Sequence, residues 1–403
     1  MGIKNLNPFL KKKCDEKKIF KNKRISDFYG ERIAIDGTNE IHILWARAYK
    51  EVVLMTDICV SEPDIKMTEE VFLKYCQKFI EVFLIHGITP ILVFDGKHPK
   101  EKTETQAKRK QKKQDIKDKI LEYRKKIENI DILSRTKLMN TELKALYCQI
   151  VSPSYTAVNT FRSILEKFGF PVLQAKGEAE ELCVMLCLDG HAVAVMSTDT
   201  DVLTYNCPLL ITGFEGYDSF ATVSLAPILN ELNIPYQTFV DLCIMSGCDY
   251  NTNIPNIASV KSYTLLLKYG SIDNLPKTYD IKCLNHEFCR EQFKYKPSLE
   301  VSETNFTNLD INIETFNLAN MYVKNTSLQE WYDKLTKMIN SLPSRKPKLN
   351  IKRPSQENIP PMLCIKSSNS SSKIEQVPEH FTESEHVYDK VSLSILDQLI
   401  DNL

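Results

Sequence analysis

The sequence lacks any apolar run near the roughly 20 residues that a membrane-spanning helix needs. It also lacks paired Cys-x-x-Cys units, although it holds 12 cysteines. Single cysteines scattered through apolar segments are typical of reduced, buried thiols. These absences predict an intracellular protein without a membrane partner and without a disulfide framework.

The formal net charge of the sequence is zero, but many of its basic residues are concentrated in two blocks. Residues 97–126 hold 13 Lys and Arg against 5 Asp and Glu, and residues 11–24 hold 8 against 2. A neutral chain with two such blocks must gather acidic residues elsewhere. The separation indicates a polyanion-binding surface beside a cation-binding site.

Three short apolar runs each end in an aspartate, at residues 32–36, 89–95 and 192–199. Continuous apolar runs of this kind are typical of a parallel sheet that is covered on both faces. Apolar periodicity predicts helices between and beside them at residues 68–86, 156–168 and 178–189. The alternation predicts an α/β fold, a doubly wound, mostly parallel sheet with helices on both faces. The functional crevice of such a sheet lies beyond the carboxyl ends of its strands.

Residues 101–150 interrupt this alternation. They are highly charged and have a helical pattern with one narrow apolar stripe from Ile116 to Ile127. A narrow stripe predicts a helix that packs on one side and leaves a basic face exposed, although a solvated surface helix is the alternative reading. A second helix around Leu143–Ile150 should pack against it.

The sequence after residue 238 predicts two helices joined by a tight turn. The first covers Thr238–Ser246 and ends at Gly247, and the second covers Ser259–Tyr269 and ends at Gly270. From about residue 341 the composition shifts to Pro, Ser, Lys and Asn. This bias is typical of a disordered tail.

Seven carboxylates follow a strand or border a helix end: Asp36, Asp95, Glu178, Glu180, Asp199, Asp201 and Asp249. Gathered in one crevice, they would repel one another strongly unless cations neutralised them. Hard ions such as Mg²⁺ or Mn²⁺ fit an all-oxygen set, and Zn²⁺ does not, because no Cys or His joins it. Two ions about 3.5–4 Å apart suit in-line attack on a phosphodiester. The residues therefore predict a metal-dependent nuclease or phosphatase, and the basic blocks favour nucleic acid.

One choice within this set stays open at the stretch Gly177–Glu181. If a helix starts near Glu178, helical spacing puts Glu178 and Glu181 on one face and Glu180 on another. Acidic residues at a helix N-terminus also have a purely structural explanation, because the helix dipole favours them there.

The order and spacing of these motifs resemble the flap structure-specific endonucleases of the XPG family, from residue 1 to about residue 275. The matching motifs are Met1-Gly2-Ile3-x-x-Leu6, Ala34-Ile35-Asp36, Val93-Phe94-Asp95-Gly96-Lys97, Gly177-Glu178-Ala179-Glu180, Thr198-Asp199-x-Asp201 and Gly247-Cys248-Asp249-Tyr250. The resemblance implies a PIN/5′-nuclease-like fold with a helical arch insertion and a helix-two-turn-helix segment. The composition is similar to that of divergent members carried by large DNA viruses.

With this resemblance the chain divides into five regions. We assign an N-terminal nuclease region (1–100), a basic helical arch (101–150), an internal nuclease region (151–255), a helix-two-turn-helix and helical region (256–340) and a largely disordered tail (341–403). The tail lacks the aromatic pair of a sliding-clamp peptide, so we expect no clamp binding, and we expect a monomer. A basic cluster at 345–353 is compatible with the nucleus, and a viral member would act in the host nucleus or at a cytoplasmic replication site.

The resemblance also implies residue roles. It assigns one Mg²⁺ to Asp36, Asp95, Glu178 and Glu180, and a second to Asp199, Asp201 and Asp249, with Glu180 between the two. It makes Lys102 and Arg109 catalytic cations at the base of the arch. It implies DNA contacts at Gly2, His42, Asn256, Ile257, Ala258 and Lys261. The turn Asn256-Ile257-Ala258 replaces the family's Gly-Ile-Gly, which restricts the loop and leaves potassium binding open.

The function predicted from these features is a structure-specific 5′-nuclease. It would hydrolyse phosphodiester bonds of DNA at 5′ flaps or 5′ ends with two Mg²⁺, in replication, repair or recombination. Two alternatives are a non-catalytic DNA-junction binder that kept the fold and a 5′→3′ exoribonuclease. Preference among flaps, nicks, gaps and Holliday junctions, and the balance of endo- and exonuclease activity, stay open.

Overall fold

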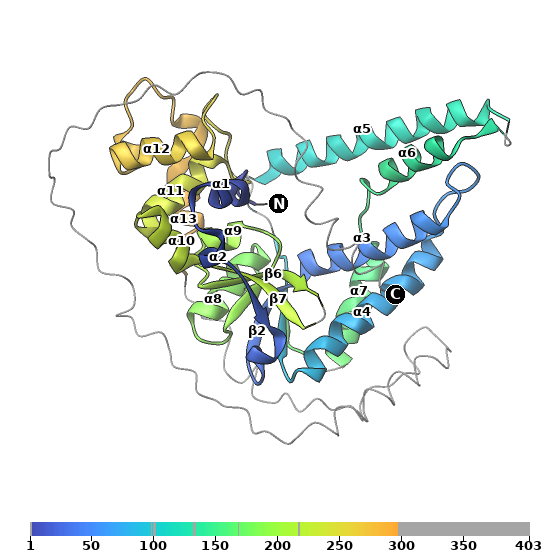
Figure 1. The fold of residues 1–403 in the computed structure, drawn as a ribbon, viewed down its shortest axis with the longest axis horizontal. Coiled ribbons are helices and arrows are strands. Elements are labelled where there is room, and N and C mark those ends of the chain that lie inside the picture. The colour runs from blue at the N-terminus through green and yellow to red at the C-terminus, as the bar shows by residue number, and fades with distance from the viewer. Residues whose placement is uncertain are drawn as a thin grey trace.

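The computed structural model describes residues 2–296, apart from 98, 100–101, 132–133, 168 and 217. A seven-stranded sheet lies at its centre in the order β1-β7-β6-β5-β2-β3-β4 (Figure 1). The strands are β1 (Phe20–Arg24), β2 (Arg32–Asp36), β3 (Thr89–Phe94), β4 (Val172–Gln174), β5 (Ala194–Met196), β6 (Leu209–Glu215) and β7 (Ser219–Ser224). Strands β2 to β6 pair in parallel, and β7 runs antiparallel to both of its neighbours, β6 and β1. The predicted mostly parallel sheet is confirmed.

Helices cover both faces of the sheet, as a doubly wound fold requires. One face packs against α3 (Gly37–Met55), α4 (Ile65–Ile85) and α7 (Tyr155–Lys167). The other packs against α1 (Leu6–Lys13), α8 (Ala179–Leu188), α9 (Asp201–Thr204), α10 (Leu225–Leu232) and α11 (Tyr236–Ser246). The side chains of β2 alternate between the two faces of the sheet. Ile33 and Ile35 belong to the apolar cluster with α3, α4 and α7, and Ala34 belongs to the cluster on the other face. This alternation explains why the buried strands read as continuous apolar runs.

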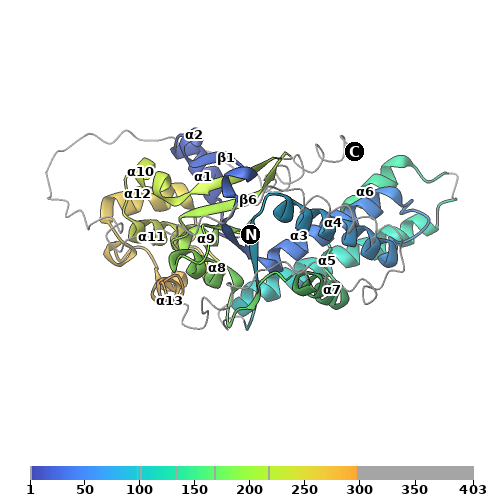
Figure 2. The same ribbon diagram turned by 90° about the horizontal axis from the view of Figure 1, so that it is seen from below.

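The charged segment after β3 forms an arm of two helices, α5 (Thr103–Glu128) and α6 (Lys137–Tyr147), which extends away from the sheet in Figures 1 and 2. The predicted stripe of α5 is its packing face. Ile116, Ile120 and Ile127 contact α6 and also the far end of α3, through Tyr49 and Val53. We therefore interpret the arm as a unit braced against α3, with its other faces exposed.

Two helices and a turn follow the last strands. Helix α11 begins two residues before the predicted start, and α12 (Ser259–Tyr269) has the predicted bounds. The short helices α2 (Glu16–Ile19) and α13 (His286–Gln292) complete the set, with 3-10 turns at Ile25–Phe28, Ile272–Asn274 and Lys282–Leu284.

Several predictions about the C-terminal part concern residues that the structure does not describe. The region 256–340 is described only to residue 296, and the tail 341–403, with its basic cluster, lies outside the described residues. Within the described part, no helix has both the length and the apolar character to cross a membrane. The eleven described cysteines are free thiols, and eight of them are buried.

Candidate active site

The predicted carboxylates meet because three strands end side by side. Strand β2 lies between β3 and β5 in the sheet, and all three run parallel. Asp36 is the last residue of β2, Asp95 follows β3 directly, and Asp199 lies three residues after β5. Since parallel strands end at the same edge, these side chains face one crevice, as predicted for this type of sheet.

Asp95, Glu178 and Glu180 form the first group of the cluster. One carboxylate oxygen from each of the three lies within 4.8 Å of those from the other two. Asp95 Oδ1 also accepts a hydrogen bond of 2.8 Å from the backbone N–H of Ala179, at the first turn of α8. A free N–H of a helix start thus holds the aspartate in place. This group alone offers three oxygens to one cation.

The structure resolves the choice between Glu180 and Glu181 by position. Glu178 caps α8 in an extended conformation, with φ −77° and ψ 141°, so helical spacing does not apply from Glu178 onward. Glu180 joins the acidic group, whereas Glu181 Oε1 lies 2.8 Å from Lys296 Nζ, in an ion pair outside it. The condition under which Glu178 and Glu181 would share a helical face is therefore not met, because α8 starts at Ala179.

Asp199, Asp201 and Asp249 form the second group, and all three are buried. The backbone N–H of Asp201 donates to Asp199 Oδ1 at 3.0 Å. Ser197 links this group to Asp36, because its hydroxyl donates to Asp36 Oδ2 at 3.2 Å and accepts from the N–H of Asp199 at 3.1 Å. Sequence reasoning missed Ser197, although its place at the end of β5 was a signal.

Burial and mutual repulsion raise the pKa values of four carboxylates in this cluster. Burial raises the pKa of Asp36 to about 7, and the charges of Asp95 and Asp199 add to the effect. Burial raises the pKa of Glu180 well above its ordinary value, and Asp36 and Asp199 raise it further. Burial also raises the pKa of Asp199 and of Asp201. Carboxylates that disfavour their own ionisation in this way are suited to bind cations.

The cluster fits hard divalent cations on two further observations. Every predicted ligand is a carboxylate oxygen, which such cations prefer. Asp201 Oδ1 is buried and, within the described part of the chain, has no hydrogen-bond partner. Buried polar atoms rarely remain unsatisfied, so this oxygen is available to a cation.

The base of the arm closes over the acidic cluster. Lys102 Nζ lies 2.6 Å from Glu178 Oε2 and 3.5 Å from Asp249 Oδ2. One guanidinium nitrogen of Arg109 donates to both oxygens of Asp249, at 2.7 and 3.0 Å. Burial acts to lower the pKa of Lys102, but Glu178, Glu180 and Asp249 raise it above its ordinary value. Both predicted cations therefore reach the site.

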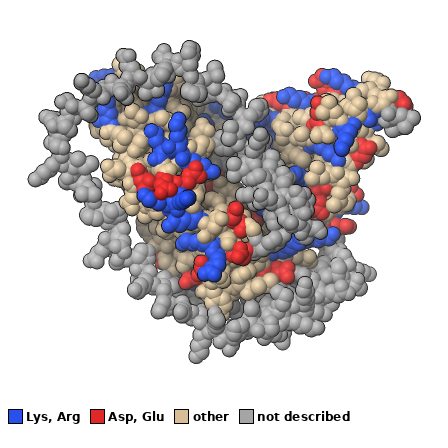
Figure 3. Space-filling view, in the orientation of Figure 1, with Lys and Arg blue, Asp and Glu red and all other residues tan. Residues whose placement is uncertain are grey.

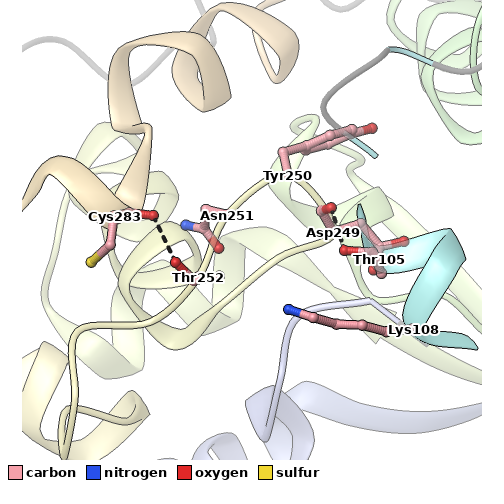
Figure 4. Close-up of a pocket in the computed structure, with 7 residues that line it drawn as sticks. All are labelled: Thr105, Lys108, Asp249, Tyr250, Asn251, Thr252 and Cys283. Carbon is pink, nitrogen blue, oxygen red and sulfur yellow. Dashed lines mark hydrogen bonds between the residues drawn. The ribbon is translucent and has the colours of Figure 1, made fainter. Parts of the chain in front are cut away.

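Thr105 is a third arm residue at the site, which sequence reasoning missed. Its hydroxyl donates to the backbone carbonyl of Asp249 at 2.9 Å. The spacing of Lys102, Thr105 and Arg109 puts them on one face of the helix, and this spacing was the available signal. A cavity of about 140 Å³ lies beside this contact. Figure 4 shows the residues that line it: Thr105, Lys108, Asp249, Tyr250, Asn251, Thr252 and Cys283.

The N-terminal segment reaches the site through Gly2. Gly2 has a φ of +96°, and an added Cβ would lie only 2.1 Å from Asp199 Oδ1 and 2.6 Å from Thr200 Oγ1. Only glycine fits this close approach. The next residue, Ile3, donates its N–H to Thr200 Oγ1 at 3.0 Å. The structure thus places Gly2 against the second acidic group.

The remaining predicted DNA contacts lie on α3 and around α12. His42 is exposed on α3, where partial burial and Lys113 lower the pKa of its imidazole and Asp95 raises it. Lys261 is exposed on α12, and the turn before this helix separates it from Asp249 in the sequence. These residues are not drawn into the acidic cluster.

The turn before α12 keeps a tight form without glycine. Asn256 adopts a left-handed conformation, with φ 60°, which asparagine tolerates better than most residues. Ile257 is buried and donates its N–H to the carbonyl of Ile254 at 3.1 Å. Ala258 caps α12 in an extended conformation that any residue adopts. Asparagine therefore supplies a left-handed conformation in this turn without a glycine.

Comparison with known families finds two matching models, the XPG N-terminal domain at residues 1–116 and the XPG I-region at residues 169–249. One similar protein is Flap endonuclease 1 of Enterocytozoon bieneusi, 28% identical over 334 residues, which covers 79% of this chain and 85% of the relative. Another is the probable RAD2-like endonuclease 369L of Invertebrate iridescent virus 6, 27% identical over 369 residues, with 80% and 86% covered.

Two solved structures share the fold. Flap endonuclease-1 from Methanococcus jannaschii has a TM-score of 0.52 and 21% identity, over 81% of this chain and 99% of that chain. Human GEN1 in complex with Holliday junction DNA has a TM-score of 0.52 and 16% identity, over 84% of this chain and 78% of that chain.

Proposed function

This chain belongs to the XPG family of nucleases, and we propose that it is a structure-specific 5′-nuclease that hydrolyses DNA at 5′ flaps or 5′ ends. The observation that carries this proposal is the acidic crevice beneath the base of a basic arm. Seven carboxylates from strand ends and helix starts gather there, and Lys102 and Arg109 lie against them. A protein that only bound DNA would gain nothing from so many acids near phosphate.

We propose Mg²⁺ as the cofactor, with two ions in each site and Mn²⁺ able to substitute. Asp36, Asp95, Glu178 and Glu180 would hold one ion, and Asp199, Asp201 and Asp249 the other. When bound, such ions neutralise the charge that develops on a phosphate during in-line attack by water. The all-oxygen ligand set and the unsatisfied Asp201 Oδ1 support this assignment.

The protein residues around the ions would position the DNA. The side chains of Lys102 and Arg109 can turn from the carboxylates toward the scissile phosphate and stabilise its oxygens. The exposed lysines along α5 would hold the phosphates of the strand that passes the arm. His42 would stack on a base, as aromatic rings do in single-strand binding, and Lys261 with the turn 256–258 would contact duplex backbone.

The test is cleavage of labelled flap, nicked and single-stranded DNA with Mg²⁺, comparing the intact protein with Asp199→Ala. We expect short products from the flap DNA, a loss of about 10³-fold or more in the variant, and DNA binding retained. Glu70→Gln, at an exposed carboxylate of α4, is the matched control and should keep full activity.

Three results would contradict the proposal. Full activity of Asp199→Ala would show that Asp199 does not hold a metal ion that cleavage requires. Intact protein that binds flaps but never cuts them in Mg²⁺ or Mn²⁺ would be a non-catalytic junction binder. Faster cleavage of matched RNA than of DNA would indicate an exoribonuclease.

A further inference from the structure

A second basic surface lies on the N-terminal elements, away from the arm. It follows the end of α1, then α2 and β1, and appears in Figure 3 as lysines and arginines gathered over these elements. We define the N-terminal basic stripe by Lys11, Lys12, Lys13, Lys17, Lys21 and Lys23. All are exposed except Lys23, which is half-buried. The proposed chemistry at the acidic crevice uses none of them.

The stripe lysines are not neutralised by the protein. Within the described part of the chain, none of the six has a carboxylate within ion-pair distance. The neighbouring Lys18 shows the contrast, because its Nζ lies 2.7 Å from Glu231 Oε1. Asp15 and Glu16 interrupt the row, and Figure 3 shows acidic atoms among the basic ones, but lysines predominate, and such an excess of positive charge favours binding of an anionic partner.

The ammonium groups of three of these lysines lie over aromatic rings. Lys11 Nζ lies 5.7 Å from the ring centre of Phe20, and Lys13 Nζ lies 5.9 Å from that of Tyr263. Lys23 Nζ lies 5.9 Å from the ring centre of Phe28. Cation–π contacts orient an ammonium without removing its charge, so these groups remain available to phosphate.

The stripe is continuous with α12, the helix to which the proposed function assigns duplex contact. Tyr263 of α12 packs edge-on against Phe9 of α1, with ring centres 5.6 Å apart. The same tyrosine lies beneath Lys13. On α12, Lys261 and Lys268 are exposed and lie seven residues apart, on one helical face. Tyr263 thus joins α12 to α1 beside the stripe, whereas helical spacing puts Lys261 and Lys268 on the opposite side of α12 from Tyr263.

Two structural roles account for part of the stripe only. Strand β1 is an edge strand of the sheet, and lysines on an edge strand prevent pairing with other chains. That role covers Lys21 and Lys23 but not the lysines of α1. The dipole of α1 favours cations in its last turn, where Lys11, Lys12 and Lys13 lie, but does not account for Lys17.

We propose that the N-terminal basic stripe binds the phosphate backbone of a duplex arm of the DNA substrate, beyond the duplex segment that contacts α12. This inference rests on the proposed function. From the end of α1 along α2 and β1 the stripe runs for roughly 25 Å. At about 3.4 Å per base pair this length matches about seven base pairs. A flap substrate must therefore carry a longer duplex arm to reach the stripe than to be cut.

The test compares Lys12→Gln/Lys17→Gln/Lys21→Gln with a matched control, Lys66→Gln/Lys74→Gln/Lys78→Gln. The first set removes three exposed stripe charges without touching a ring contact, and the second removes three exposed charges from α4. Flap DNAs with a duplex arm of about 10 or about 30 base pairs are bound in Ca²⁺, and anisotropy is followed over a salt series. Thermal unfolding of each variant checks the fold.

For the long-arm DNA we expect the stripe variant to bind roughly tenfold more weakly at about 0.1 M salt. The slope of log K against log salt should fall by about two to three, since each lost phosphate contact removes about 0.9. The short-arm DNA and the control variant should behave as the intact protein does.

An unchanged salt slope on the long arm would overturn the inference, as would an equal loss on both arms, which would indicate a general loss of charge. Aggregation of the variant with unchanged DNA binding would overturn it too, because the lysines would then only protect the edge strand. Failure of the proposed function is distinct. If the proposed function is wrong, the intact protein cuts neither flap DNA. Its binding to the long-arm and short-arm DNAs can still be measured, so the two failures can be told apart.

Discussion

The two groups of the acidic cluster are built differently. One carboxylate oxygen each from Asp95, Glu178 and Glu180 already lies within 4.8 Å of the other two, and of the three residues only Glu178 is fully buried. The second group is buried and bonded to the protein, since Asp199 accepts from the Asp201 N–H and Asp249 is bound by Arg109. The first group therefore offers three converging oxygens but must release Lys102 from Glu178 to bind a cation, whereas a cation at the second group must compete with Arg109 for Asp249.

Two residues connect these groups. Glu180 belongs to the first group, yet its pKa is raised by Asp36 on one side and by Asp199 on the other, after burial. Lys102 lies near Glu178 of the first group and Asp249 of the second. A carboxylate and an ammonium thus lie between the two groups. Substituting either residue tests whether the two groups act as one site or independently.

The largest expected effect comes from replacing Glu180 and Glu181 with glutamine in two separate variants. Glu180→Gln should lower the cleavage rate by about 10³-fold, because the charge between the two groups is lost. Glu181→Gln should stay within about threefold, since Glu181 pairs with Lys296 outside the cluster. Single-turnover cleavage of flap DNA measures both rates. An inactive Glu181→Gln protein beside an active Glu180→Gln protein would reverse the assignment.

A smaller effect is expected at the base of the arm. Lys102→Ala should lower cleavage by about 10²-fold and Arg109→Ala by about tenfold, because Lys102 contacts both groups and Arg109 only Asp249. Loss of Lys102 should also tighten Mg²⁺ binding, since its ammonium competes for the same oxygens. Mg²⁺ titration by calorimetry, beside the single-turnover rates, checks this. Weaker Mg²⁺ binding by Lys102→Ala would contradict a competing role.

The sheet and the strand-end aspartates could be predicted from sequence because both follow from local patterns. A buried parallel strand is a continuous apolar run, and the residue after it lies at the crevice whatever the loop does. Asp36, Asp95 and Asp199 each follow such a run. The fold class and the gathering of acids therefore needed no knowledge of long-range contacts.

Other features could not be predicted because they depend on one dihedral angle or on distant contacts. The choice of Glu180 depends on the extended conformation of Glu178, which no periodicity encodes. The apolar stripe of α5 predicted its packing against the second arm helix, α6, but not the participation of Tyr49 and Val53 from the far end of α3 in the same cluster. Thr105 acts through the backbone carbonyl of Asp249, a contact between residues 144 positions apart.

The last and smallest effect concerns stability without metal. An ordinary aspartate has a pKa of about 3.9, whereas burial raises that of Asp36 to about 7. Between these values the folded protein keeps a proton that the unfolded chain has lost. The contribution of Asp36 to stability is therefore fully present below about pH 4 and is lost as pH rises through about 7.

Asp36→Asn removes this dependence while keeping the shape of the side chain. Its Oδ1 can still accept from the Asn39 N–H, and its amide nitrogen would donate to the Ser197 hydroxyl instead of accepting from it. In a chelator above pH 7 we expect the variant to be more stable than the intact protein by about 1 to 3 kcal/mol, with little difference near pH 4. Urea unfolding at the two pH values measures this. With Mg²⁺ the order should reverse, because only the intact protein gains the energy of a bound ion. If the stabilities of the two proteins depended equally on pH, Asp36 would ionise freely in the folded protein and would not interact with the buried second group.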